Sequence, residues 1–329
     1  MENSSIKNIF LNKTVLITGG AGFIGSNLAK AIYKFAKKVV IFDLFGSQNT
    51  LGHFKNLTNI TNKTGGGGEF FLDFEIIPGC ITKDLDKIKC LDFDFLYHFA
   101  AISDTTQIDQ KRMLEVNYEA FSALLKIALD KGAKIIYASS AGVYGNTQAP
   151  NKVGFNEMPE NIYGFSKLLM DNKVRALLKE DPSLPIIGLR YFNVYGEGEY
   201  YKGKTASMIF QLTNQIKQHK SIKLFEFGEQ KRDFVYIKDV TNANILAAAS
   251  KKGGVYNIGS GESSSFNDIV NLLKKIFDFE VQYIKNPYDF FQQHTKADIL
   301  QTKQDLGYVP RYSLEAGINE YLNEHLKNI

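Results

Sequence analysis

The sequence predicts an α/β fold: a doubly wound parallel sheet, with a second, smaller mixed α/β domain. Three observations predict it. Short, wholly apolar runs alternate with segments of helical periodicity over roughly the first 190 residues. A glycine-rich loop joins the first apolar run to the first helical segment, and the alternation loosens after about residue 192. Strands that are apolar on both faces need helices on both sides of their sheet, as in doubly wound proteins.

The expected elements follow this alternation along the chain. Helical periodicity is clear at 22–35, where Ile24, Leu28 and Ile32 recur at a spacing of four residues. Buried strands are expected at 14–18, 39–43, 74–77, 93–98, 134–139 and 186–191. Longer helices are expected at 113–131 and 163–178.

The looser second part of the chain mixes shorter elements. We expect residues 1–191, joined by about 232–253, to form the sheet domain. Residues 192–231 and 254–329 are expected to form the smaller domain, which closes over the carboxyl edge of the sheet. In this part, strands are expected at 222–227, 234–237, 255–258 and 281–284, and helices at 206–218 and 265–277.

The composition is that of a soluble globular protein and excludes several classes. Of the 329 residues, 44% are apolar and 22% charged, and 39 basic against 35 acidic residues give a net charge of +4. No block of like charge predicts nucleic-acid binding, and no apolar run predicts a membrane span or signal peptide, so we expect a cytoplasmic protein. The histidines show no metal-ligand spacing, so no metal is expected. Cys80 and Cys90 are expected as buried thiols, and the glycines at 65–68 as a surface loop.

The glycine-rich loop has the spacing of a dinucleotide-binding site. Gly19, Gly22 and Gly25 lie between the first strand and the helix that follows it. Glycines there let the backbone approach a pyrophosphate while the helix N-terminus provides N–H donors. Asp43 ends the second strand, where a carboxylate accepts hydrogen bonds from the adenosine ribose. Because no arginine follows Asp43 closely, the residues themselves favour NAD over NADP, and the sheet domain is expected to be a Rossmann domain.

A second cluster has the chemistry of proton and hydride transfer. Tyr163 and Lys167 form a Tyr-x-x-x-Lys pair, which places both side chains on one helical face. An ammonium beside a phenol favours the phenolate, so we expect a lowered pKa for Tyr163, which then takes a proton from an alcohol as hydride leaves. Ser140 follows the fifth strand, at the edge where α/β sheets bind ligands, and is expected to hold the substrate hydroxyl.

Together these motifs resemble the extended short-chain dehydrogenase/reductase family, which contains nucleotide-sugar epimerases and dehydratases. The resemblance runs from residue 14 to at least 298. Dehydratases of the family carry Thr-Asp-Glu after the fifth strand. This chain has Ser140, Ala141 and Gly142 there, so the resemblance implies no 4,6-dehydration.

Five further segments are similar to the branch of this family that epimerises an ADP-linked heptose. The resemblance implies inversion of C6 in ADP-D-glycero-D-manno-heptose, by transient oxidation to a ketone and re-reduction on a bound nicotinamide cofactor. The product is a precursor of the lipopolysaccharide inner core. An epimerase or reductase acting on a UDP- or GDP-sugar is the alternative. The segments are 101–106, 190–196, 201–207, 223–226 and 231–236.

The resemblance also implies roles for single residues. Tyr163 and Lys202 match the two acid/base residues, the cofactor is NADP with NAD as the alternative, and the protein is a homo-oligomer. From the residues alone, Lys202 also fits a solvated lysine, and Arg232 a surface ion pair with Asp233. Lys204, Gln211 and Phe291 stand where the branch has serine, histidine and tyrosine. The implied catalytic residues are Tyr163, Lys202, Lys167 and Ser140. The implied cofactor contacts are Gly19, Gly22, Phe23, Ile24, Gly25, Asp43, Ala100, Ala101, Ser103, Asn117, Tyr163, Lys167 and Val194. The implied substrate contacts are Ser140, Asn193, Lys204, Gln211, Phe225, Glu226, Arg232 and Phe291.

Overall fold

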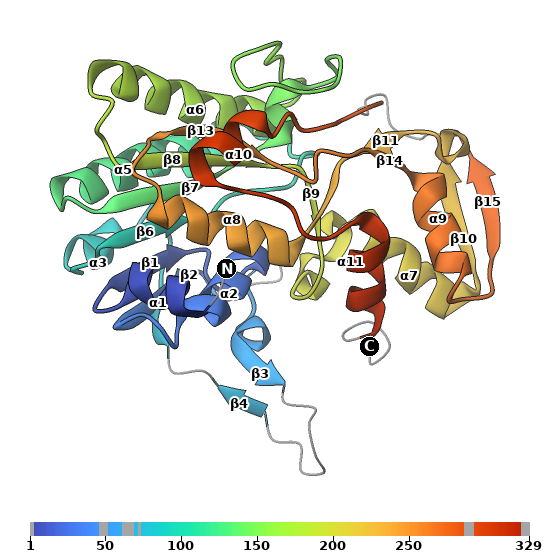
Figure 1. Cartoon of the computed structure of the whole chain (residues 1–329), viewed down its shortest axis with the longest axis horizontal. Coiled ribbons are helices and arrows are strands. Elements are labelled where there is room, and N and C mark those ends of the chain that lie inside the picture. The colour runs from blue at the N-terminus through green and yellow to red at the C-terminus, as the bar shows by residue number, and fades with distance from the viewer. Residues whose placement is uncertain (1–2, 46–51, 61–68, 72–73, 286–292, 324–329) are drawn as a thin grey trace.

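A seven-stranded parallel sheet forms the centre of the computed structural model, which describes residues 3–45, 52–60, 69–71, 74–285 and 293–323 (Figure 1). The strand order is β13-β8-β7-β6-β1-β2-β5, and every neighbouring pair is parallel. The doubly wound fold is thereby confirmed. The strands are β1 (Thr14–Thr18), β2 (Lys38–Asp43), β5 (Glu75–Pro78), β6 (Phe95–His98), β7 (Lys134–Ser140), β8 (Ile186–Tyr191) and β13 (Gly254–Ile258).

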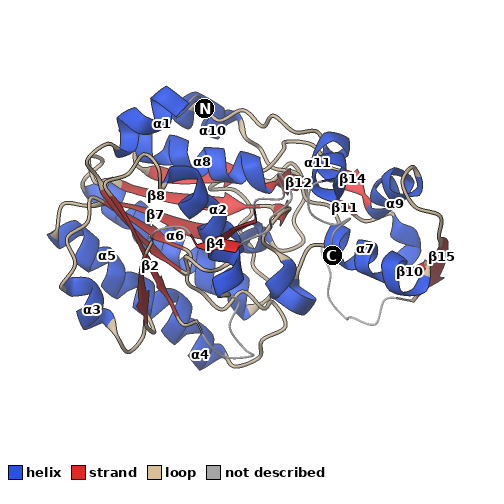
Figure 2. Ribbon diagram, turned by 90° about the horizontal axis from the view of Figure 1, so that it is seen from below, coloured by secondary structure: helices blue, strands red, loops and turns tan. Residues whose placement is uncertain are grey.

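Helices cover both faces of this sheet, which is why its central strands are buried and mostly apolar. All six residues of β8 are buried, as are all four of β6. Figures 1 and 2 show one helical layer on each side. One layer contains α1 (Asn3–Phe10), α2 (Phe23–Ile32), α8 (Ile237–Ala249) and, at the β13 edge, α10 (Leu300–Leu306). The other contains α3 (Leu85–Lys89), α4 (Gln110–Leu114), η2 (Glu115–Glu119), α5 (Ala120–Asp130) and α6 (Ile162–Glu180).

Two expectations about the sheet domain are corrected. The helix expected at 113–131 is interrupted by η2, a π-helical turn that contains Asn117, because the side chain of Asn117 bonds outside the helix. The strand expected at 255–258 in the smaller domain is instead β13, which pairs with β8 at the edge of the main sheet. Its apolar residues complete the sheet after the chain has returned from the smaller domain.

The remaining elements gather beyond the carboxyl end of the sheet (Figure 2). Three strand pairs form there: β9 with β12, β10 with β15, and β11 with β14. The strand expected at 222–227 stops at residue 225, because Phe227 has a left-handed backbone with φ of 61°. These elements are β9 (Asn193–Tyr195), η4 (Tyr200–Thr205), α7 (Met208–His219), β10 (Ser221–Phe225), η5 (Glu226–Gly228), β11 (Lys231–Arg232), β12 (Phe234–Tyr236), β14 (Ser264–Ser265), α9 (Phe266–Lys274), β15 (Glu280–Ile284) and α11 (Leu314–Tyr321).

Several smaller features complete the description. Cys90 is exposed at the end of α3 and Cys80 is half-buried, so the expectation of buried thiols is wrong. The glycines at 65–68 lie outside the described residues. Within the described part of the chain, no helix has the length and apolar character that a membrane crossing requires. The other short elements are η1 (Phe54–Leu57), β3 (Thr58–Ile60), β4 (Glu69–Phe71) and η3 (Ala141–Tyr144).

Candidate active site

The glycine-rich loop makes a tight turn between β1 and α2. Gly19 has a φ of 69°, and a Cβ atom there would lie 2.5 Å from the backbone nitrogen of Ala100. A Cβ on Gly25 would lie 2.4 Å from the carbonyl oxygen of Gly19. Gly22 is the N-cap of α2, so the first-turn N–H groups of Phe23 and Ile24 have no partner inside the helix. This glycine cradle at a helix N-terminus fits the pyrophosphate of a dinucleotide.

Asp43 holds the same loop from the end of β2. Its carboxylate is buried and accepts hydrogen bonds from the backbone N–H groups of Ala21, at 3.0 Å, and Leu44, at 2.7 Å. Burial raises the pKa of Asp43, and these hydrogen bonds oppose that shift. The backbone of Phe45 is also hydrogen-bonded to this carboxylate, and acceptance from a ribose hydroxyl remains a prediction.

The chain after β6 lies directly beside the glycine loop. The N–H groups of Phe99 and Ala100 both donate to the carbonyl oxygen of Thr18, at 2.9 and 3.1 Å. Ser103, four residues further, has a buried hydroxyl with no hydrogen-bond partner among the described residues. A buried hydroxyl of this kind is normally satisfied, so Ser103 fits a ligand contact at this edge. Ala101 is half-buried between these residues.

Asn117 supports this loop from behind. Its side chain is fully buried and makes two hydrogen bonds with the backbone of Ile102, at 2.8 and 3.0 Å. A third bond, of 3.1 Å, reaches the hydroxyl of Ser166 on α6. Its π-helical turn is a form that often marks functional sites. Asn117 therefore joins the loop to α6, and its predicted contact with the cofactor stays a prediction.

Tyr163, Lys167 and Ser140 come together at the end of β7. Asn161 caps α6 by accepting from the N–H of Gly164, which places Tyr163 in the first helical turn. The phenol of Tyr163 is hydrogen-bonded to Ser140. The Lys167 ammonium lies 5.9 Å from the centroid of the Tyr163 ring. These predicted catalytic residues therefore form one cluster.

The electrostatics of this cluster differ from the expectation. Burial raises the pKa of Tyr163, and the hydrogen bond from Ser140 only partly offsets this rise. The ammonium of Lys167 donates to the carbonyl oxygen of Ala138, at 2.8 Å, instead of the phenol. The expectation of a lowered pKa for Tyr163 is therefore wrong for this arrangement. Burial also lowers the pKa of Lys167 to about 8, although Asp171 favours its charged form.

Asp171 anchors the helix that carries this cluster. It is fully buried and accepts hydrogen bonds from the hydroxyls of Tyr137, at 2.8 Å, and Ser139, at 2.9 Å. The guanidinium of the fully buried Arg190 adds an ion pair of 2.7 Å. These bonds fix α6 against β7 and β8. The interval of four residues between Lys167 and Asp171 was the available sequence signal for this acid.

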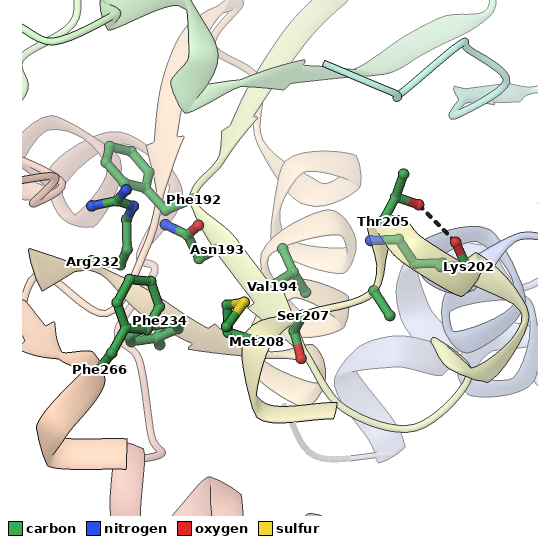
Figure 3. Close-up of a pocket in the computed structure, with 11 residues that line it drawn as sticks. Phe192, Asn193, Val194, Lys202, Thr205, Ser207, Met208, Arg232, Phe234 and Phe266 are labelled. Atoms are coloured by element: carbon green, nitrogen blue, oxygen red, sulfur yellow. Dashed lines mark hydrogen bonds between the residues drawn. The ribbon is translucent and has the colours of Figure 1, made fainter. Parts of the chain in front are cut away.

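A cavity of about 370 Å³ lies beyond the sheet edge, between Lys202 and Arg232 (Figure 3). Lys202 projects from η4, and its ammonium lies 5.3 Å from the ring centroid of Phe23, the first residue of α2. Burial lowers the pKa of Lys202, so it is not the solvated lysine of the alternative interpretation. The lining residues are Phe192, Asn193, Val194, Lys202, Thr205, Ala206, Ser207, Met208, Arg232, Phe234 and Phe266.

Arg232 presents a cation at the other end of the cavity. Its guanidinium donates to the carbonyl oxygen of Lys231, at 2.9 Å, and lies 5.7 Å from the ring centroid of Phe266. Burial lowers the pKa of Arg232 to about 10. The alternative ion pair with Asp233 is absent, because that buried carboxylate accepts from Ser260 and from the backbone. Arg232 has no ion pair within the described part of the chain, so it fits an anionic ligand.

Comparisons with known proteins identify the family of this chain. The model of the NAD dependent epimerase/dehydratase family matches residues 15–259. The chain belongs to the NAD dependent epimerase/dehydratase family. The glycine loop and the Tyr163 cluster both fall within the matched range, and the expected family is confirmed.

Individual members of the family are similar over nearly the whole chain. An ADP-L-glycero-D-manno-heptose-6-epimerase of Brachyspira hyodysenteriae is 36% identical over 322 residues, covering 93% of this chain and 96% of that protein. The crystal structure of the Helicobacter pylori ADP-L-glycero-D-manno-heptose-6-epimerase has 48% identity and a TM-score of 0.87, covering 100% and 99% of the two chains. A UDP-N-acetylglucosamine 4-epimerase from Methanobrevibacter ruminantium, in complex with UDP-N-acetylmuramic acid, has 28% identity and a TM-score of 0.85, covering 97% and 100%.

Not every residue predicted for this epimerase-family site lines the cavity. Lys204 is exposed and forms an ion pair of 3.0 Å with Asp104. The amide of Gln211 donates to the carbonyl oxygens of Lys204, at 3.1 Å, and Ala206, at 2.7 Å, so it holds η4 in place. Phe225 is half-buried at the end of β10 and is not among the cavity residues. Glu226 begins η5, and Phe291 lies outside the described residues.

Proposed function

We propose that this protein inverts C6 of ADP-D-glycero-D-manno-heptose to give ADP-L-glycero-D-manno-heptose. The observation that carries the proposal is a second base, the half-buried Lys202, which lines the cavity and lies against Phe23 of the cofactor loop. Epimerisation requires proton transfer to and from one hydroxyl in two orientations, and Tyr163 and Lys202 offer two acid/base groups on different elements. The two heptose epimerases described above support the same substrate.

The cofactor in this proposal is NADP, with NAD as the alternative. A bound nicotinamide would supply the hydride chemistry at C6. Gly19, Gly22 and Gly25 would leave room for the pyrophosphate, and the N–H groups of Phe23 and Ile24 would face its oxygens. The family description supports a nicotinamide cofactor. The choice of NADP rests on the resemblance to the heptose-epimerase branch, whereas the Asp43 carboxylate beside the loop supports the alternative, NAD.

The side chains have separate tasks in this scheme. Ser140 holds the C6 hydroxyl, and Tyr163 in its phenolate form takes the hydroxyl proton and becomes a phenol. The positive charge of Lys167, 5.9 Å from the centroid of the Tyr163 ring, favours the phenolate before this step. After the ketone has turned over in the site, Lys202 returns a proton to the oxygen in its new orientation. Lys202 is suited to this task because burial lowers the pKa of its ammonium.

Arg232 would bind the diphosphate of the nucleotide sugar. A guanidinium forms two parallel hydrogen bonds with phosphate oxygens, which fixes orientation as well as binding. Asn193 shares the cavity with Arg232 and would contact the sugar. On the resemblance alone, we also propose that the protein is a homo-oligomer and acts in the cytoplasm. Its product would be a precursor of the lipopolysaccharide inner core.

Incubation with ADP-D-glycero-D-manno-heptose and chromatographic separation of the epimers tests the proposal. UDP- and GDP-sugars in parallel tubes test the alternative substrates, and Tyr163→Phe protein prepared in the same way controls for contaminating activity. Substrate deuterated at C6 should keep its label in the product, because the hydride returns to the same carbon. Loss of the label to water would reject the oxidation and re-reduction scheme.

A further inference from the structure

We propose that Glu199 is a positioning residue that holds the loop of residues 196–207 closed and keeps the ammonium of Lys202, within this loop, charged. The importance of this role for catalysis rests on the proposed function, whereas the effect on Lys202 itself does not. The argument begins with a carboxylate that has no contact with solvent, three residues before Lys202 in the chain. Ionised groups that are fully buried need several strong partners.

Glu199 has such partners on both sides of the loop. One carboxylate oxygen accepts from the N–H of Gly196, at 3.0 Å, and from the hydroxyl of Ser207, at 2.9 Å. The other oxygen accepts from the N–H of Ser207, at 2.6 Å. These bonds join residues 196 and 207, and η4 with Lys202 lies between them. The carboxylate therefore closes the base of the loop.

A second contact reaches Glu199 from the end of the chain. The buried phenol of Tyr321, on α11, is hydrogen-bonded to Glu199. Ser207, the main partner of the carboxylate, also caps α7 by accepting from the N–H of Phe210 at 3.2 Å. The loop that carries Lys202 is thus fixed to α7 and α11 through one side chain.

The same carboxylate acts on the charge of Lys202. Glu199 and Lys202 bracket one turn of this loop, because the N–H of Lys202 donates to the carbonyl oxygen of Glu199, at 2.9 Å. The Phe23 ring from α2 lies 5.3 Å from the Lys202 ammonium. Burial lowers the pKa of Lys202, while Glu199 favours the charged form. Burial also raises the pKa of Glu199, and Lys202 opposes that shift. Tyr195 and Tyr321 are the other titratable groups that face Glu199.

Competitive acetylation of the folded protein tests this charge effect without any substrate. Acetic anhydride reacts with a neutral amine, so the labelling rate of Lys202 between pH 6 and 10 reports its protonation. Removal of a nearby charge shifts a pKa by about one unit or more. In Glu199→Gln we therefore expect Lys202 to react about tenfold faster at pH 7. The exposed Lys204 in the same loop serves as the internal reference.

Glu197→Gln is the matched control, because Glu197 belongs to the same loop but lies 3.7 Å from Lys30 on α2. It should leave the reactivity of Lys202 within about twofold of wild type. Tyr321→Phe is the milder variant if Glu199→Gln does not fold, and it should shift Lys202 in the same direction. Equal Lys202 reactivity in wild type and in the folded variants, or an equal shift in Glu197→Gln, would overturn the proposal.

Turnover then separates the two proposals. If ADP-heptose is the substrate, Glu199→Gln should lower kcat at least tenfold and leave KM within about threefold, because Arg232 still binds the diphosphate. Normal kcat in a folded Glu199→Gln enzyme rejects the positioning role but leaves the proposed function intact. No turnover of ADP-heptose by wild type rejects the proposed function, while the acetylation result still decides whether Glu199 controls Lys202.

Discussion

The two lysines of the site belong to regions that are built in different ways. Lys167 lies on α6, a 19-residue helix packed against the central sheet. Lys202 lies in η4, a six-residue 3₁₀ segment that follows β9. Burial lowers the pKa of both ammonium groups, and each is paired electrostatically with a nearby acid, Asp171 or Glu199.

The difference lies in how each region is held. Asp171 joins α6 to β7 and β8, which pair with each other in the main sheet. The region of Tyr163 and Lys167, which we call the cofactor side, is therefore held by the sheet. Glu199 joins Gly196 and Ser207, the two ends of the loop that carries Lys202. This region, which we call the substrate side, is therefore held by side-chain hydrogen bonds. We infer that the substrate side depends on the bonds of a single side chain, whereas the cofactor side is supported by the whole sheet.

The largest expected effect is the loss of kcat on removal of the Tyr163 hydroxyl. Tyr163→Phe keeps the ring but removes the proton acceptor, and general acid–base groups contribute about 10²–10⁴-fold. We expect kcat to fall by about 10³–10⁴-fold with unchanged thermal unfolding. Tyr283→Phe, which removes only an exposed hydrogen bond to Asn267, is the matched control. Substantial turnover by Tyr163→Phe would remove Tyr163 from the mechanism.

The corresponding change on the substrate side is Lys202→Met, which removes the ammonium at similar volume. We expect a fall in kcat of about 10²–10³-fold, because one of the two orientations of the hydroxyl loses its proton donor. Binding of the reduced dinucleotide, followed by its fluorescence, should stay within about threefold. Normal turnover by Lys202→Met would show that Lys202 is not an acid/base residue and would leave Tyr163 as the only base.

Stability at alkaline pH tests the buried state of Lys167. Its pKa is lowered to about 8 in the folded protein, so between about pH 8 and 10.5 the unfolded chain holds one more proton. The free energy of unfolding then rises with pH, by about 3 kcal/mol across this window relative to Lys167→Met. Denaturant titrations at pH 7.5, 9 and 10.5 measure this difference. Lys126 lies on the exposed side of α5, so Lys126→Met should show the same pH dependence of the free energy of unfolding as wild type.

Arg232→Ala should mainly affect substrate binding. A lost charge-assisted hydrogen bond costs about 1.5–3 kcal/mol, which is about a 10- to 150-fold rise in KM for the nucleotide sugar. Arg232→Lys should recover only part of this loss, because an ammonium does not form the bidentate contact. Weakened dinucleotide binding with unchanged KM would instead assign Arg232 to the cofactor side.

The smallest expected effect is that of Lys204→Met. The Lys204 side chain is 77% exposed and pairs with Asp104, and exposed ion pairs contribute about 0–1 kcal/mol. KM should therefore change at most about fivefold, and Asp104→Asn should have a similarly small effect. A rise in KM above about tenfold for Lys204→Met alone would support the predicted contact between Lys204 and substrate.

The sequence was most informative where function depends on local spacing. The apolar strands, the glycine loop and the Tyr163–Lys167 pair each lie within one short segment, and their places in the structure match the prediction. Ser140 was also found, because the ends of parallel strands meet at one sheet edge. These features need no knowledge of distant contacts.

Features that depend on tertiary contacts could not be predicted from the residues alone. Periodicity does not distinguish a helical turn from the π turn at Asn117, which forms because its side chain bonds a neighbouring loop. The direction of the pKa shift of Tyr163 depends on burial, and a pair motif does not report burial. Lys202 and Arg232 were identified only by resemblance, because their desolvation comes from the cavity around them.

The position of β13 has a consequence for biosynthesis. β13 closes the sheet beside β8, yet it is translated only after η4, α7 and α8. Until residue 258 leaves the ribosome, the nascent chain carries β8, whose residues are all buried in the folded protein, as an edge strand without its outer neighbour, and such edges promote association between chains. The seven-stranded sheet therefore cannot be completed before residues 254–258 have been synthesised. A fragment of residues 1–191 should aggregate when expressed alone, and the ribosome must deliver most of the chain before the sheet is complete.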